Sequence, residues 1–414
     1  MDDSWVEVPE GSDFPLANLP FGVVVGADLP ARVGVRIGDA VVDVAAVVAS
    51  GVLGDGVAPT WFAAASLDPF LAAGPAAWRR VRSRLTDVLA DRRREAALRP
   101  HLLPADGLRC LLPFTVADFV DFSASRHHAE NLGRILRPDG QALPAAWLHL
   151  PIGYHGRAGT VVVSGTSIVR PRGLRRPAGG DGSPEDGPSA RLDVEAEVGF
   201  VVGVGSRLGE PVSADAFAEH VFGVVLVNDW SARDLQALEY VPLGPFLGKS
   251  FATSVSPWVV PLDALDAARL PCPPQSPSPA AHLRDAAGWG LDLDLRVSCN
   301  GTDVARPPFA ALHWTPAQLL AHLTSNGASL RPGDLFASGT VSGPEPGQWG
   351  SFVELTRGGR EPVRLADGST RTFLADGDTV SITATAPAVG GGRLGFGAVS
   401  GTVVPARPRR YASP

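Results

Sequence analysis

The chain has 414 residues, of which 45% are apolar and 19% are charged, and its formal net charge is −7. This length predicts two domains or one large domain, and the apolar fraction excludes a globally disordered chain. The negative charge argues against a nucleic-acid-binding protein, and no apolar stretch reaches the roughly 20 residues that cross a bilayer.

The cysteines and the first residues indicate an intracellular protein. Cys110, Cys272 and Cys299 are scattered and odd in number, and their spacing matches neither a disulfide framework nor a zinc site. The opening residues, MDDSWVEVPE, are acidic and lack the apolar core of a signal peptide. We therefore expect a cytoplasmic protein with reduced thiols and with neither membrane nor nucleic-acid partners.

Residues 1–112 are predicted to form a small β-barrel-like domain. Short β-like runs such as FGVVV and ARVGVRIGDAVVDVAAVV carry Gly-Asp turn signals. Apolar residues at spacings of three and four predict a helix over 76–98. No residue of this part points to catalysis.

Residues 113–414 are predicted to form a larger β-rich domain, antiparallel or mixed, with few helices. Two segments rich in Pro, Gly and Ser, 171–191 and 271–280, are interpreted as surface loops. One helix is expected over 315–326, with Thr315 as its N-cap and Pro316 in its first turn. The fold class is therefore mainly β, of the α+β type.

Two acids in a strand-like segment suggest a metal site. Glu195 and Glu197 lie in the apolar run LDVEAEVGFVVGVG, and residues two apart on a strand face the same side. Two buried carboxylates on one side repel each other, and a hard cation such as Mg²⁺ or Ca²⁺ removes that repulsion. The alternative is that both acids face solvent and only their apolar neighbours face inward.

Two further acids occupy suitable positions. Asp229 ends the uncharged run VFGVVLVN, where a ligand or a catalytic acid is often placed, although it could instead cap the following turn. Asp121 precedes a helical segment and could equally be an N-terminal helix acid. A site that uses all four acids would be assembled from distant parts of the chain.

A histidine follows Asp121 at a spacing of two helical turns. This spacing can place His128 on the side of Asp121, where it could act as a general base beside a cation. Glu354, expected on a strand within SFVELT, could orient that histidine. The alternatives are a surface His-His pair at 127–128 and an exposed strand acid.

Residues 228–258 combine polar groups with aromatic residues and tight turns. This stretch contains Arg233, Gln236, Tyr240, Lys249 and Thr253, and such variety is typical of a pocket lining. Lys249 is the only lysine of the chain. A compact ammonium is therefore expected where the wide guanidinium of arginine does not fit, although chance is an equal alternative.

Several long motifs resemble the fumarylacetoacetate hydrolase family. They are SDFPLANLPFGVV, DFSASRHHAENLGRILR, WLHLPIGYHGRAGTVVVSG, LDVEAEVGF, VLVNDWSARDLQALEYVPLGPFLGKSF, RPGDLFASGTVSGPEP and LADGDTVSITA. The resemblance implies an SH3-like N-terminal β-barrel domain followed by a mixed β-roll domain, and a homodimer. It also implies hydrolysis of the carbon–carbon bond of 4-fumarylacetoacetate to fumarate and acetoacetate, the last step of tyrosine and phenylalanine catabolism, with Mg²⁺ or Ca²⁺ as cofactor.

The same resemblance assigns roles to individual positions. It implies that His128 activates water and Glu354 orients it, with Lys249 and Gln236 as further catalytic groups. The implied metal site comprises Asp121, Glu195, Glu197, Asp229, Lys249 and Thr253. The implied substrate contacts are Arg137, Tyr154, Gln236, Tyr240 and Thr340. This chain has Ser123 where the family usually has tyrosine, and the shorter side chain leaves a gap or a water there.

Two other functions stay open at this point. Another β-diketone or acylpyruvate hydrolase, or a related isomerase or decarboxylase, would use similar chemistry, but such relatives are typically shorter and lack the N-terminal domain. A metal-stabilised binding protein without activity would keep the acids and lose turnover.

Overall fold

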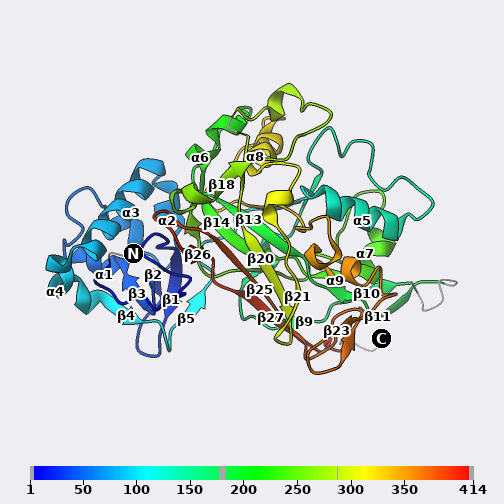
Figure 1. Cartoon of the computed structure of the whole chain (residues 1–414), viewed down its shortest axis with the longest axis horizontal. Helices are drawn as coiled ribbons and strands as arrows, with labels where there is room; N and C mark the ends of the chain where they lie inside the picture. Colours follow the sequence, from blue (N-terminus) through cyan, green and yellow to red (C-terminus); the bar gives the residue numbers. More distant parts are fainter. Residues whose placement is uncertain (1–3, 177–182, 287, 410–414) are drawn as a thin grey trace, which may run out of the picture.

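A computed structural model describes residues 4–176, 183–286 and 288–409. Its described part is mainly β-structure with short helices, which confirms the predicted fold class. Figure 1 shows a small N-terminal β domain at one side and longer strands that cross the middle of the molecule. None of the helices in the described ranges combines the length and the apolar content that a bilayer crossing requires.

The N-terminal part contains one antiparallel sheet, with the strand order β4-β3-β2-β1-β5. Short apolar runs separated by turns let β1, β2 and β3 pair in succession, and β5 is the edge strand that pairs with β1. The strands are β1 (Phe21–Val25), β2 (Arg32–Ile37), β3 (Ala40–Asp43), β4 (Leu102–Pro104) and β5 (Arg109–Leu111). The helices of this part are α1 (Val44–Ala49), α2 (Asp68–Ala72), α3 (Pro75–Ala90) and α4 (Glu95–Leu98).

An eight-stranded mixed sheet forms the base of the larger part. Its order is β7-β6-β22-β13-β14-β16-β8, with β17 beside β14. The pairs β6–β22 and β8–β16 are parallel and the other pairs are antiparallel. The strands are β6 (Phe119–Phe122), β7 (Gly153–His155), β8 (Val161–Val163), β13 (Ala196–Val202), β14 (Val221–Asn228), β16 (Thr253–Val255), β17 (Val260–Pro261) and β22 (Leu335–Ala337).

A six-stranded sheet packs against the first, since side chains of both sheets share one apolar core. Its order is β21-β20-β25-β27-β9, with β26 beside β25. Its strands are β9 (Ile168–Val169), β20 (Asp294–Cys299), β21 (Thr302–Ala305), β25 (Thr379–Pro387), β26 (Arg393–Gly395) and β27 (Val399–Val404). Four two-stranded sheets use β10 (Arg172–Arg175), β11 (Glu185–Pro188), β12 (Leu192–Asp193), β15 (Ser231–Ala232), β18 (Arg269–Pro271), β19 (Trp289–Leu291), β23 (Val363–Arg364) and β24 (Thr370–Arg371).

Strand β14 is buried on both faces, which explains its uncharged sequence. Val224 and Leu226 belong to the core between the two large sheets. Val225 and Val227 belong to a second core, which the eight-stranded sheet shares with the N-terminal part. Because successive side chains of a strand point to opposite faces, both faces need apolar residues here.

The helix predictions are confirmed in part. Helix α8 (Pro316–Thr324) begins after Thr315, whose side chain forms a capping box with Gln318. The helix expected over 76–98 is interrupted, because α3 ends before Asp91, whose backbone is extended. The other helices are α5 (Arg126–Leu136), α6 (Phe217–His220), α7 (Arg233–Glu239) and α9 (Phe352–Leu355).

The interpretation of 171–191 as a loop is wrong in part. Antiparallel pairing of β10 with β11 makes this segment a hairpin. The pairs run from Arg172↔Pro188 to Arg175↔Glu185, and the charged pairs Arg172–Asp186 and Arg175–Glu185 add to it. Cross-strand ion pairs stabilise this hairpin, although its content of Pro, Gly and Ser alone is typical of a loop. Residues 177–182, between the two strands, lie outside the described residues.

Candidate active site

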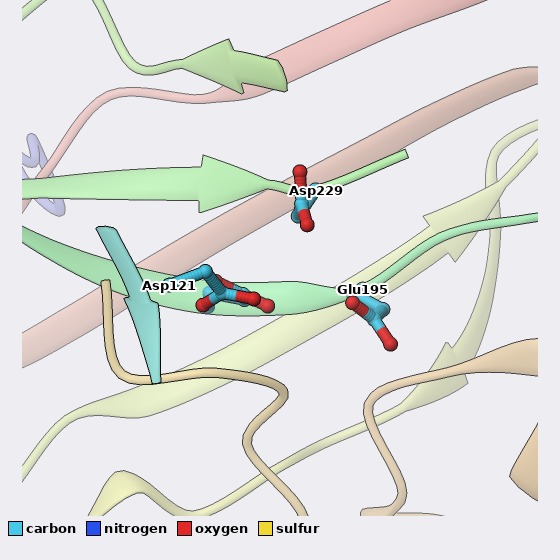
Figure 2. A group of neighbouring side chains, drawn as sticks. Asp121, Glu195 and Asp229 are labelled. Carbon is cyan, nitrogen blue, oxygen red and sulfur yellow. The ribbon is translucent and has the colours of Figure 1, made fainter. Parts of the chain in front are cut away.

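Four buried carboxylates converge at one point of the eight-stranded sheet. Asp121, Glu195, Glu197 and Asp229 each offer an oxygen atom, and these atoms all lie within 4.8 Å of one another. Their exposed fractions are between 0 and 4%. Figure 2 shows that Asp121, Glu195 and Asp229 come from three separate segments of the chain. The burial excludes the alternative in which Glu195 and Glu197 face solvent.

The register of β13 and β14 explains why three of the acids share one face. Glu197 lies opposite Val227 in the antiparallel pair, so both side chains point to the same side of the sheet. Glu195 is two residues before Glu197, and Asp229 is two residues after Val227. The period of two therefore places all three acids on the face that Val227 defines.

Asp121 reaches the same face from a third strand. It lies opposite Ala337 in the parallel pair β6–β22, and Ala337 lies opposite Gly199 of β13. Since Gly199 is two residues after Glu197, Asp121 joins the face of the other acids. The alternative interpretation of Asp121 as an N-terminal helix acid is wrong, because the residue belongs to β6 and the helix begins at Arg126.

The cluster fits a bound cation. Burial, together with repulsion by the neighbouring carboxylates, raises the pKa of Asp121 and of Glu197 well above their usual values. Both carboxylate oxygens of Glu197 and Oδ1 of Asp121 are buried, and they have no hydrogen-bond partner among the described residues. Buried polar atoms normally have a partner, so these three oxygens are suitable ligands for a metal ion.

Three donors fix the carboxylate of Asp229. The Thr253 hydroxyl donates to Oδ1 at 2.6 Å, while the Tyr154 hydroxyl and the Lys249 ammonium donate to Oδ2 at 2.7 and 2.9 Å. Lys249 also donates to Oε2 of Glu195. Thr253 and Lys249 thus both contact the carboxylates of the cluster.

Lys249 is a buried cation among acids. Burial alone would lower its pKa, but Asp229 and Glu195 outweigh this and raise the pKa above its usual value. The ammonium therefore stays charged. Two of its three protons are given to carboxylates, and the third remains for a ligand.

His128 lies beside the cluster and is oriented by Glu354. Its Nδ1 is 2.8 Å from Oε2 of Glu354, and its Nε2 is 3.9 Å from Oε1 of Glu195. An ionised Glu354 accepts a hydrogen bond from Nδ1, and Nε2 is the nitrogen directed at the cluster. Ser125 holds the start of α5 by accepting a hydrogen bond from the backbone N–H of His128 at 3.2 Å.

Glu354 is held by several donors, and it lies on a helix rather than on the expected strand. Asn131 donates to its Oε1 at 3.0 Å, while Ser342 and Ser351 donate to Oε2 at 3.0 and 2.7 Å. Burial opposes ionisation, but His128 and these hydrogen bonds lower the pKa of Glu354 below its usual value. The carboxylate is therefore ionised, as orientation of the imidazole requires.

Asp193 explains why the residues around Glu354 form a helical turn. Its carboxylate accepts hydrogen bonds from the backbone N–H groups of Phe352 and Val353, at 2.7 and 3.1 Å, at the beginning of α9. These N–H groups have no partner within the helix, so an acceptor there stabilises the turn. The sequence pattern of alternating residues in SFVELT could not show this distant acceptor.

The sequence analysis did not predict a buried chain of ion pairs that links the acid cluster to helix α9. Arg233 donates to Asp193 at 2.8 Å and to Oε1 of Glu195 at 2.7 Å, and it also donates to Oε1 of Gln236 at 3.1 Å. Asp193, Glu195 and Glu197 are spaced by two in LDVEAE, and this spacing was a signal for Asp193. Through Arg233 and Asp193, the acid cluster is linked to the helix that carries Glu354.

The expected substrate contacts do not share one cavity. Arg137, Gln236 and Tyr240 line one cavity of about 460 Å³, together with Ser123, whose hydroxyl accepts a hydrogen bond from Nε1 of Trp147 at 3.3 Å. Tyr154 lines a second cavity of about 300 Å³ that reaches Asp229, Lys249 and Thr253. Thr340 is buried with a hydroxyl that has no partner in the described part, and it lines neither cavity.

Family models match most of the chain. The model described as fumarylacetoacetase N-terminal matches residues 17–113, and the one described as fumarylacetoacetate (FAA) hydrolase C-terminal matches residues 118–404. The chain belongs to the fumarylacetoacetase family. It is 45% identical to the fumarylacetoacetase of Homo sapiens, covering 97% of this chain and 99% of the relative, and 42% identical to that of Arabidopsis thaliana, covering 98% and 99%.

Solved structures share the fold of this fumarylacetoacetase family member at low sequence identity. A fumarylacetoacetate hydrolase from Exiguobacterium antarcticum matches with a TM-score of 0.55 and 18% identity, covering 94% of this chain and 100% of the other. A maleylpyruvate hydrolase from Sphingobium matches with a TM-score of 0.51 and 16% identity, covering 94% and 100%. These likenesses concern the fold alone.

Proposed function

We propose that this protein is a metal-dependent hydrolase that cleaves the carbon–carbon bond of 4-fumarylacetoacetate to give fumarate and acetoacetate. This reaction ends the catabolism of tyrosine and phenylalanine. The observation that carries the proposal is the convergence of four buried carboxylates beside the His128–Glu354 pair, in a chain of the fumarylacetoacetase family. A small diketo acid is thus the expected substrate.

The four carboxylates Asp121, Glu195, Glu197 and Asp229 are the proposed ligands of Mg²⁺ or Ca²⁺, because these cations prefer carboxylate oxygens. When bound, the cation would supply a Lewis acid that polarises carbonyl oxygens of the substrate. Lys249, Thr253 and Tyr154 keep the carboxylates in place through the hydrogen bonds described above.

His128 is the proposed general base. Its Nε2 takes a proton from a water molecule, whose oxygen then attacks the ketone carbon of the fumaryl group. Glu354 keeps the other nitrogen protonated and stabilises the imidazolium that forms. The carbon–carbon bond then breaks, and its electron pair leaves with the acetoacetate part as an enolate.

Lys249 and Gln236 are the proposed stabilisers of the leaving group. The third proton of the Lys249 ammonium is free, and the amide nitrogen of Gln236 remains available because its oxygen accepts from Arg233. Hydrogen-bond donors that already point at the position of the developing negative charge lower the activation barrier, because they need not reorganise during the reaction. The imidazolium of His128 then returns its proton to the carbanionic carbon, which balances the reaction.

A hydrolysis assay tests the proposed function directly. Absorbance of fumarylacetoacetate is followed with and without Mg²⁺ or Ca²⁺, and after treatment with EDTA. We expect loss of absorbance that depends on the added cation. Turnover of acylpyruvates without turnover of fumarylacetoacetate would instead identify another diketone hydrolase, and a cation-dependent melting temperature without any turnover would identify a binding protein.

Replacing Lys249 by arginine should impair turnover although it keeps the charge. The ammonium lies buried between Glu195 and Asp229, where a planar guanidinium cannot occupy the same position. We expect Lys249→Arg to reduce kcat about 100-fold, a typical effect of displacing a stabilising donor. Steady-state kinetics with a melting curve of the variant measure this, and normal kcat would contradict the role given to the ammonium.

Three further expectations stay predictions. A homodimer is implied by the family resemblance, and sedimentation velocity of the purified chain would test it. A cytoplasmic location is expected from the unpaired thiols. The division of the chain into domains at residues 112 and 113 is likewise a prediction, testable by limited proteolysis.

A further inference from the structure

The cavity that contains Arg137, Gln236 and Tyr240 is positively charged. Five arginines line it, while its described lining contains no Asp or Glu. Such a wall is unexpected in a chain with a net charge of −7. The five are Arg137, Arg191, Arg233, Arg357 and Arg360.

Within the part of the chain that the structure describes, two of these five cations have a carboxylate partner. Arg233 pairs with Asp193 and Glu195, and Arg357 pairs with Glu361 at 3.0 Å. Among the described residues, Arg137, Arg191 and Arg360 form no ion pair. Three guanidinium groups therefore remain available to an anion inside this cavity. The family resemblance accounts for Arg137 and leaves Arg191 and Arg360 without a role.

Phe373 lies beside Arg191 and beside the turn that carries Arg360. The guanidinium of Arg191 lies over the Phe373 ring, 5.5 Å from its centre, and Phe373 itself lines the cavity. Gly359, next to Arg360, has a φ of +88°, and a Cβ on it would lie 2.9 Å from Cε2 of Phe373. The turn that carries Arg360 thus packs closely on the same ring.

Arg191 is held through its backbone, and Arg360 is held through its side chain. The backbone carbonyl of Arg191 accepts a hydrogen bond at 2.9 Å from the backbone N–H of Arg233, and the side chain of Arg233 contacts Glu195 of the acid cluster. Nε of Arg360 donates to the backbone carbonyl of Arg357 at 2.9 Å, which leaves the terminal guanidinium nitrogens for a ligand. Both residues are exposed at the protein surface, so the anion they bind can enter from solvent.

We propose that Arg191 and Arg360 form an anion subsite that binds one terminal carboxylate of a dicarboxylate diketone. This proposal rests on the proposed function and names the class of substrate. Fumarylacetoacetate carries a carboxylate at each end, so Arg137 alone leaves the second carboxylate without a guanidinium partner. Guanidinium groups bind carboxylates through paired hydrogen bonds, which also select against an uncharged end.

The test compares two substrates in Arg191→Ala, Arg360→Ala and the double variant. One substrate is fumarylacetoacetate, and the other is a diketone with a single carboxylate. We expect KM for the dicarboxylate to rise about 10-fold in each single variant, as for loss of one charged hydrogen bond, while kcat changes less than about threefold. KM for the monocarboxylate should stay constant, and Arg191→Lys should recover part of the loss.

Arg364→Ala is the matched control, because Arg364 is exposed, forms no ion pair within the described ranges and does not line the cavity. An unchanged KM in the double variant, or an equal rise for both substrates, would overturn the subsite. If the unmodified protein hydrolyses neither substrate, the proposed function fails separately. Calorimetry with fumarate as the probe then tests the subsite. If the subsite exists, fumarate should bind more weakly to the double variant than to the Arg364→Ala control.

Discussion

The His128→Ala variant should lose turnover and keep its cation. We expect kcat to fall by about 10³-fold, within the range typical for loss of a general base. The cation should still bind with nearly unchanged affinity, because Nε2 of His128 lies 3.9 Å from Glu195, beyond hydrogen-bond distance, and the four carboxylates stay in place without it. Steady-state kinetics and calorimetric titration with Mg²⁺ or Ca²⁺ measure the two effects.

His127→Ala provides a control on the same helix. His127 is only half-buried, whereas His128 is buried against Glu354, so its removal should leave kcat within about twofold of the original. Glu354→Gln is a second informative variant, since an amide can no longer stabilise the imidazolium. Retained turnover in His128→Ala would show that another group activates the water.

Glu197→Gln should abolish cation binding and with it turnover. Both oxygens of Glu197 are buried without a partner in the described part, which makes them suitable ligands for a cation. The amide keeps the shape but removes a charge that Asp121 and Asp229 repel, and this repulsion contributes to the raised pKa of Glu197. We therefore expect the metal-free variant to melt at or above the temperature of the metal-free original.

Melting curves with and without the cation separate these effects. The original protein should gain stability when Mg²⁺ or Ca²⁺ is added, because a ligand that binds only the folded state stabilises it. Glu197→Gln should show little of this gain, and Glu219→Gln, which changes an exposed acid, should show all of it. If Glu197→Gln keeps the full cation-dependent shift, Glu197 is not a ligand.

Local patterns were sufficient for several parts of this protein. The uncharged run of β14 and the two-residue spacing of Glu195 and Glu197 correctly predicted strands. Successive side chains of a strand alternate between its two faces, because the period of two is a property of the extended backbone. The N-cap of α8 followed from Thr315 and Pro316, which act within one helical turn. The family motifs supplied the candidate residues of the site.

Local patterns failed where a distant partner decides the conformation. SFVELT alternates like a strand, yet it forms α9 because the carboxylate of Asp193 accepts its first N–H groups. Asp121 precedes a helix in sequence, yet it lies on β6 because that strand pairs with β22, more than 200 residues later. Neither partner is visible in the segment itself.

By itself, the sequence determined the strand character and alternation of β13 and β14, the start of α8 and the identity of the candidate groups. Only the tertiary structure decided that Asp121, Glu197 and Asp229 share one face, that Lys249 lies between two of the acids, and that Arg191 and Arg360 line one cavity. The physical reason is that alternation is set within a strand, whereas the face that meets its neighbours is set by the register between strands far apart in the chain.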